Sequence, residues 1–441
     1  MSYTDLGQCW REDLEIPNLR ELSHALYKEI KPMYTLLHGV ARFFLRKRYG
    51  DLVPEKGLIP AHLLGDLWSQ NWEPLADLIT EKTIDLEASI NELKWTVIKM
   101  IKMAEDFYRS LGLPDLPDSF WEKSVFSRRT YESARCHGMA ADMYKQDDYR
   151  LLYCSETSPD DFRIIHHELG HIQYYMAYAH QPTLFRQANS ALHESIGDAV
   201  MYGVMTPQHL HRLRLINDSM LYTTGNDTRD DNVVDDQDGI VSEDFGMNTD
   251  ITNTSSDIIL LLKQALNKIP QIPFAILIEE YRWRFFEGDI KVHSLNSDFW
   301  IMASKLQGIS PPEERDEKYF DIGARFHVPD NTPYIRYFLS SFLQHQLFES
   351  LCKAAVFGRR DISEALPSTI PLNRCDIYGS KTAGRLLKDL MSRGHSQHWR
   401  EILQSTTGKD HVSVLPIKRY YRPLYKFLSK LVRKYHIPMG W

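Results

Sequence analysis

The chain has 441 residues, of which 43% are hydrophobic and 25% are charged, proportions that are ordinary for a soluble globular protein. Its net charge of −7 at pH 7 is modest for this length, so the charge points neither to nucleic acid nor to an anionic membrane as a partner. No run of 18 or more apolar residues occurs, which argues against a transmembrane helix, and the polar sequence after Met1 predicts no signal peptide.

Helical periodicity dominates the N-terminal part of the chain. Residues 18–48 and 82–112 carry apolar side chains at helical spacing and predict two long amphipathic helices. Pro32 is expected to kink or divide the first of them. Shorter helices are predicted after Pro60 and over residues 120–127.

Residues 131–165 have a different pattern. Tyr131–Met139 and Tyr149–Cys154 predict two short strands around a turn at residues 145–148, and therefore a β-hairpin. The open edge of such a hairpin is a place where the backbone of an extended peptide can pair.

The most informative stretch holds an HExxH motif at residues 167–171. On a helix this spacing places the imidazoles of His167 and His171 on one face, one turn apart, where both can bind zinc. Glu168 is offset by one residue and can act as a general base. The alternative is a helix that merely buries two histidines.

A third metal ligand is expected further along the chain. Glu194 lies 23 residues after His171, far enough for a second helix to return to the first. Asp198 follows four residues later on the same helical face and can orient a ligating imidazole. The set asks for one open ligand position, which is typical of catalytic zinc.

Helices alternate with one acidic segment in the next part of the chain. Thr206 and Pro207 predict the start of a helix. Residues 225–250 are rich in acidic side chains without apolar periodicity and predict a solvated loop. Calcium binding is the alternative there, although the spacing and downstream Glu of an EF-hand are missing. Further helices are predicted at residues 258–267, 273–286 and 299–306.

The C-terminal part combines a loop with further helices. Residues 324–337 are rich in proline and turn residues but also in His, Arg and Tyr, and predict a site loop that leads into a helix ending at Phe357. A last helix is predicted around residues 424–435, with its basic face toward solvent. We find no repeat and no low-complexity linker, so residues 1–441 are expected to form one mainly α-helical domain.

The five cysteines fall into two local pairs, Cys136 with Cys154 and Cys352 with Cys375, and leave Cys9 alone. This spacing suggests two loop-closing disulfides and an oxidising compartment, whereas five buried thiols in a cytosolic protein is the alternative. Glycosylation sequons compatible with secretion begin at Asn217, Asn226 and Asn253.

Five separate stretches agree on one family. HHELGHIQYY, ALHESIGD, IPAHLLGDLW, GARFHVPDNTPYIRYF and CDIY resemble the angiotensin-converting-enzyme family of zinc peptidyl-dipeptidases, and the similarity runs from about Thr4 to Trp441. The resemblance implies a large helical domain with a deep central cleft and a small antiparallel hairpin beside the zinc helix. It also implies that His167, His171 and Glu194 bind zinc, that Glu168 activates water, and that Asp198 supports the ligands.

The resemblance implies roles for residues in the site loop and hairpin as well. His327 and Tyr337 match the residues that stabilise the tetrahedral intermediate. His137 matches the histidine that holds the substrate backbone, and Gly138 stands beside it where the family commonly has Ala.

A further set matches the family's grip on the free C-terminal carboxylate of the substrate: Gln70, Arg325 and Tyr334. That grip implies release of C-terminal dipeptides. Arg325 replaces the usual Lys, a planar fork in place of a point charge. Gln70 is kept where the related branch that removes single residues has an Arg, which favours dipeptide release.

The resemblance also bears on chloride and on disulfides. Phe299 and Ala303 replace the Trp and Arg of one chloride site, which is therefore expected to be lost. Arg336 matches the second site, but Cys9 stands where its Tyr partner is expected, so chloride at this site is left open. Both cysteine pairs fall on family disulfides, which favours an extracellular location.

The family has several helices before the region that matches Thr4, and they form the lid and one wall of the cleft. We expect this chain to be a fragment or a truncated member with an open cleft.

From these observations we expect a monomeric zinc peptidyl-dipeptidase that acts on small peptides with a free C-terminus. The main alternative is a non-catalytic zinc-binding or scaffold protein, inactivated by loss of the lid. An endopeptidase of the thermolysin type is a third, in which the set Gln70, Arg325 and Tyr334 would have no purpose.

Overall fold

The structure is a computed structural model that describes residues 3–80, 83–127, 138–221, 254–359 and 364–441. Five features named above lie outside these ranges: Cys136, His137, Asn226, Asn253 and the acidic segment 225–250. The predictions made for them stay predictions.

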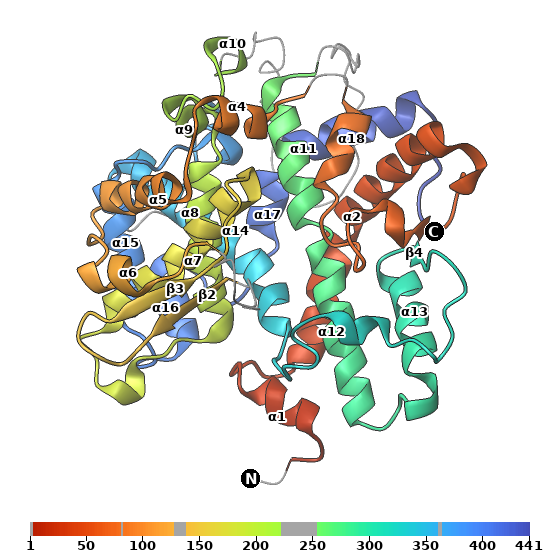
Figure 1. Cartoon of the computed structure of the whole chain (residues 1–441), viewed down its shortest axis with the longest axis horizontal. Coiled ribbons are helices and arrows are strands. Elements are labelled where there is room, and N and C mark those ends of the chain that lie inside the picture. Colours follow the sequence, from red (N-terminus) through yellow and green to blue (C-terminus); the bar gives the residue numbers. More distant parts are fainter. Residues whose placement is uncertain (1–2, 81–82, 128–137, 222–253, 360–363) are drawn as a thin grey trace.

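The described residues form a mainly α-helical fold, as predicted, and the helices surround α7, α8 and α14 (Figure 1). The longer helices are α2 (Leu19–Tyr49), α5 (Val97–Leu111), α7 (Pro159–Tyr178), α8 (Ser190–Val204), α11 (Ser256–Lys268), α12 (Gln271–Phe286), α13 (Leu295–Leu306), α14 (Ile335–Phe357), α15 (Lys381–Ser392) and α18 (Arg422–Lys434). The shorter ones are α1 (Leu6–Glu12), α3 (Ala76–Ile79), α4 (Leu86–Glu92), α6 (Asp118–Lys123), α9 (Pro207–Arg212), α10 (Asp218–Leu221), α16 (Trp399–Thr407) and α17 (Leu415–Tyr420).

Two small sheets complete the described fold. β2 (Met139–Asp142) and β3 (Tyr149–Leu152) form an antiparallel hairpin around the predicted turn, with Met139 opposite Leu152. The second strand lies where it was predicted, but the first begins at Met139 rather than ending there, and residues 131–137 lie outside the described ranges. The hairpin lies beside α7 (Figure 1). β1 (Ile59–Pro60) pairs in parallel with β4 (Ile309–Ser310), a contact that the sequence did not predict.

Some expectations about helices were wrong. The helix predicted after Pro60 is only a 3-10 turn over Ala61–Leu63. Pro32 does not divide α2, which runs through it without a break. Pro32 lies on the exposed face of α2. Proline has no N–H to donate to the carbonyl four residues earlier, and on this face water can donate to that carbonyl instead. Residues 82–112 form α4 and α5 rather than one helix, because Lys94 has a left-handed backbone and the side chain of Thr96 accepts a hydrogen bond from the Lys99 N–H, which starts a new helix.

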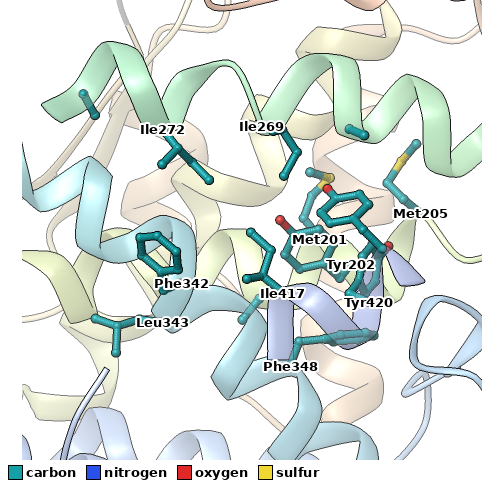
Figure 2. Packing of buried hydrophobic residues seen from close by; sticks show 14 of the residues in the cluster. Met201, Tyr202, Met205, Ile269, Ile272, Phe342, Leu343, Phe348, Ile417 and Tyr420 are labelled. Atoms are coloured by element: carbon teal, nitrogen blue, oxygen red, sulfur yellow. The ribbon is translucent and has the colours of Figure 1, made fainter. Parts of the chain in front are cut away.

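One part of the hydrophobic core lies where α8, α14 and α17 meet. Figure 2 shows Tyr202 of α8 against Phe348 of α14 and Tyr420 of α17, with ring centres 5.7 and 4.8 Å from that of Tyr202. All three rings are buried. This packing fixes α8 against α14, the helix that follows the site loop.

One predicted disulfide is present, between Cys352 of α14 and Cys375. Cys136 lies outside the described residues, so its pairing with Cys154 stays a prediction. Among the described helices none combines the length and the apolar character needed to cross a membrane.

Candidate metal centre

Local sequence signals begin the helix that carries the motif. Ser158 caps α7: its hydroxyl accepts from the Asp161 N–H at 3.1 Å, while Asp161 Oδ2 accepts from the Ser158 N–H at 2.8 Å. Pro159 occupies the first helical position, where its missing N–H is not needed. His167 and His171 therefore lie in the middle of a long helix, one turn apart on one face.

Two glycines bring α8 against α7. A Cβ at Gly170 would lie 2.5 Å from Gly197 Cα, and a Cβ at Gly197 would lie 2.4 Å from the carbonyl oxygen of His167. Any larger residue would force the helices apart. This backbone contact carries Glu194, one turn before Gly197, to the two imidazoles.

The three predicted ligands meet at one point. His167 Nε2 and His171 Nε2 are 3.2 Å apart, and Glu194 Oε2 lies 3.4 Å from the first and 3.6 Å from the second. Ligands at the corners of a zinc tetrahedron are about 3.4 Å apart, given metal–ligand bonds of about 2.0–2.2 Å. Two imidazole nitrogens and one carboxylate oxygen at these distances fit a zinc ion with one position left open.

Each imidazole is held through its other nitrogen. Asp198 Oδ1 lies 3.2 Å from His167 Nδ1, and Asp198 Oδ2 accepts from Lys268 Nζ at 2.8 Å. The Nδ1 atoms of His171 and His193 lie 2.6 Å apart, within hydrogen-bond distance, so one of the two nitrogens donates and the other accepts. These partners orient both rings toward the metal position.

Burial and neighbouring charges set the pKa values of the three ligands. Burial lowers the pKa of His167, but Asp198 and Glu194 outweigh it and place the pKa well above its usual value. Burial, the adjacent His193 and His167 keep the pKa of His171 well below its usual value. Burial opposes ionisation of Glu194, yet the two imidazoles lower its pKa to about 2, so it is a carboxylate at neutral pH.

Glu168 differs from the other carboxyl groups at the centre. Burial, opposed by His167 and reinforced by Glu194, raises the pKa of Glu168 to about 7. A group with this pKa can both accept and return a proton near neutral pH. Its carboxylate also fills the space beside Gly138, where a Cβ would lie 2.7 Å from Glu168 Oε1.

The site loop, residues 324–337, whose last residues begin α14, brings two predicted oxyanion donors together. His327 Nε2 lies 3.1 Å from the hydroxyl of Tyr337. Burial, with Glu194 adding to it, raises the pKa of the Tyr337 phenol well above its usual value, so the phenol keeps its proton.

The three residues expected to bind a carboxylate also meet. Arg325 Nη2 donates to the hydroxyl of Tyr334 at 2.8 Å, and this hydroxyl lies 3.5 Å from Gln70 Oε1. The Arg325 guanidinium also lies over the ring of Trp68, 5.2 Å from its centre. Residues more than 250 positions apart in the chain thus form one polar cluster.

Comparison with known proteins agrees with this geometry. A model of the family described as angiotensin-converting enzyme, Peptidase M2, matches residues 1–441. This chain belongs to that family. Angiotensin-converting enzyme of Rattus norvegicus is 37% identical over 446 residues, 100% of this chain and 31% of the rat protein.

Two invertebrate members of the angiotensin-converting enzyme family are similar to a comparable degree. The angiotensin-converting enzyme-related protein of Drosophila melanogaster is 35% identical over 447 residues, 100% of this chain and 65% of that protein. Angiotensin-converting enzyme of Theromyzon tessulatum is 36% identical over 434 residues, 97% of this chain and 64% of the other. The chain therefore spans between about a third and two thirds of the length of these family members.

The residues named for the two chloride sites lie in different surroundings. Arg336 Nε donates to the carbonyl of Pro333 at 3.2 Å. Phe299 and Ala303 are buried in the core, and Cys9 is a free thiol on α1. The loss of the first chloride site stays a prediction, and chloride binding at Arg336 stays open.

Two residues of the centre were not singled out from the sequence. Lys268 comes from the end of α11, 70 residues after its partner Asp198, and no local pattern connects the two. His193 directly precedes Glu194, and this adjacency was a signal that could have been used.

Proposed function

We propose that this protein is a zinc-dependent metallopeptidase of the angiotensin-converting enzyme family that releases dipeptides from the C-terminus of small peptides. The observation that carries the proposal is the meeting of His167, His171 and Glu194 at distances that fit zinc, with Glu168 next to them. The deep central cleft expected from the resemblance, and a single domain over residues 1–441, are part of this proposal.

The side chains of the centre divide the chemistry between them. A zinc ion held by the three ligands supplies Lewis acidity, which polarises a peptide carbonyl and acidifies water. Glu168 takes the proton of the attacking water and returns it to the departing amine, for which a pKa of about 7 is suited. Tyr337 and His327 donate hydrogen bonds to the carbonyl oxygen as negative charge develops on it.

The polar cluster of Arg325, Tyr334 and Gln70 is proposed to determine which peptide bond is cleaved. Arg325, Tyr334 and Gln70 offer a guanidinium, a hydroxyl and an amide, which together suit a carboxylate. A grip on the free C-terminus limits the distance from that end to the cleaved bond. By resemblance, His137 and Gly138 are proposed to hold the substrate backbone.

The compartment and the assembly state are proposals as well. The Cys352–Cys375 disulfide supports an oxidising, extracellular setting. A monomer is proposed because small peptide substrates require no second subunit.

The test compares the protein with its Glu168→Gln variant. Zinc per molecule is measured in both, and each is assayed with a peptide that has a free C-terminus and with the amidated form of that peptide. We expect one zinc in both proteins, dipeptide release by the wild type from the free peptide only, and loss of turnover in the variant.

Other results would assign a different function. Zinc without cleavage of either peptide would favour a non-catalytic binding protein, and equal cleavage of both would favour an endopeptidase. Full activity of Glu168→Gln would show that another group is the base.

A further inference from the structure

The site loop is bonded to a buried ion pair on α12. Glu279 and Arg282 lie one turn apart on this helix, and Arg282 Nη2 donates to Glu279 Oε2 at 2.7 Å. Their side chains are 0% and 6% exposed. On its other side the Arg282 guanidinium lies over the ring of Trp10 from α1, 4.7 Å from its centre.

Both members of the pair bond to the backbone of the site loop. Arg282 Nη1 donates to the carbonyl oxygens of His327 at 3.2 Å and Thr332 at 2.8 Å. The Thr332 N–H in turn donates to the His327 carbonyl at 3.0 Å, so Arg282 closes both ends of one turn. Glu279 Oε2 accepts from the Tyr334 N–H at 2.6 Å, just before α14 begins.

Stability alone does not account for such a pair. Two charges removed from water carry a large desolvation penalty, and apolar residues of similar size are often as stable or more so. Glu279 Oε1 and Arg282 Nε are buried without a hydrogen-bond partner among the described residues, which adds to the penalty. The site-loop groups that gain bonds are backbone atoms of His327 and Tyr334, which carry the proposed chemistry, and of Thr332, which closes the turn between them.

We propose that Glu279 and Arg282 are positioning residues, which hold the site loop so that its side chains meet the substrate. They fix the main chain at His327 and Tyr334, and through the start of α14 they place Tyr337 one turn further on. This inference rests on the function proposed above.

Loss of the ion pair should affect turnover but not zinc binding. The zinc ligands belong to α7 and α8 and make no bond to the pair, so zinc binding does not depend on it. Displacement of a donor by about 1 Å is enough to reduce turnover about 100-fold. Loss of the pair should therefore lower kcat about 10- to 100-fold and leave zinc content unchanged.

The test uses Arg282→Met, Arg282→Lys and Glu279→Gln, with Glu280→Gln as the matched control. Glu280 is the next residue of α12, is also mostly buried and accepts from Arg20 Nε at 2.9 Å, but it makes no bond to the site loop. Zinc content, kcat and KM are measured, together with amide hydrogen exchange of residues 325–337 and of α7.

We expect exchange of residues 325–337 to be at least tenfold faster in Arg282→Met and in Glu279→Gln, with exchange of α7 unchanged. Arg282→Lys keeps the charge but replaces the guanidinium fork by a single donor nitrogen, so kcat and protection should be lost only in part. Glu280→Gln should leave the exchange of the site loop and kcat at wild-type values.

Wild-type exchange of residues 325–337 in both Arg282→Met and Glu279→Gln would overturn the proposal whatever the activity. Equal loss of kcat in Glu280→Gln would also overturn it, because any charge on α12 would then have the same effect. If the wild type cleaves no peptide, the proposed function is wrong and the positioning role in catalysis is wrong with it. Faster exchange of residues 325–337 in Arg282→Met and Glu279→Gln would then still show that the pair holds the site loop.

Discussion

The substitution Asp198→Asn tests how the metal centre is held. Asp198 Oδ1 lies 3.2 Å from His167 Nδ1, and its other oxygen accepts from Lys268 at 2.8 Å. A hydrogen bond to a charged acceptor contributes about 1.5–3 kcal/mol, and one to a neutral acceptor about 0.5–1.5 kcal/mol. Asparagine keeps the shape of the side chain but not its charge, so we expect the free energy of zinc binding to become about 1–2 kcal/mol less favourable.

This difference corresponds to zinc affinity that is roughly 5- to 30-fold weaker, at the lower end of what such outer partners contribute. The assay is competition for zinc with a chromophoric chelator at constant pH. Asp218→Asn is the matched control, because Asp218 also pairs with a histidine, His211 Nε2 at 2.7 Å, but on the exposed surface of α10.

An Asp198→Asn affinity within twofold of wild type would refute the reasoning, since the orientation of His167 would then be independent of the carboxylate. An equal loss in Asp218→Asn would refute it too, because the effect would not be local. Lys268→Met, measured beside them, reports how much of the support depends on the charge behind Asp198.

Three further predictions concern the base, the fold in acid and the disulfide. In Gly138→Ala the new Cβ would lie 2.7 Å from Glu168 Oε1, which is the movable end of a flexible side chain, and the resemblance places Ala at this position in the family. We therefore expect the carboxylate to shift and kcat, zinc content and thermal unfolding to stay near wild-type values, whereas a fall in kcat of roughly tenfold would show that the carboxylate cannot move without losing its function. Burial lowers the pKa of His345 from 6.5 to about 3, so the unfolded state binds the extra proton as the pH falls below 6.5 and stability falls with it. The free energy of unfolding of the metal-free protein, measured with urea, falls between pH 7 and pH 5. This fall should be about 2 kcal/mol smaller in His345→Asn than in wild type, and equal falls would argue against a neutral His345. Replacing both Cys352 and Cys375 by Ala opens a loop with a sequence separation of 23 and should lower the free energy of unfolding by about 3 kcal/mol, whereas a loss below about 1 kcal/mol in urea would show that the loop is ordered without the bond.

Much of the metal helix could be predicted from the sequence. The cap at Ser158 and the proline after it start α7, and the helical repeat places His167 and His171 on one face. These are local signals, carried by residues within one or two turns of each other. The start of α9 after Thr206 was predicted from the same kind of signal and is confirmed, because the Thr206 hydroxyl accepts from the His209 N–H, whereas the equivalent signal at Ser158 was not used.

Other features could not be predicted because their partners are distant in the chain. Pro32 was expected to kink or divide the first long helix, and it does not divide α2, because the effect of a proline depends on whether its face is exposed, which only packing determines. The bonds of Glu279 and Arg282 to the site loop span about 50 residues, and neither residue belongs to a motif.

The sequence alone determined which chemical groups are available and their spacing along each helix, because side-chain direction follows from the helical period. HELGH therefore indicated two imidazoles and a base before any fold was known. The tertiary structure decided whether those groups meet. Glu194 reaches the imidazoles because Gly170 and Gly197 let two helix backbones touch, and the approach of two backbones is set by packing rather than by sequence spacing.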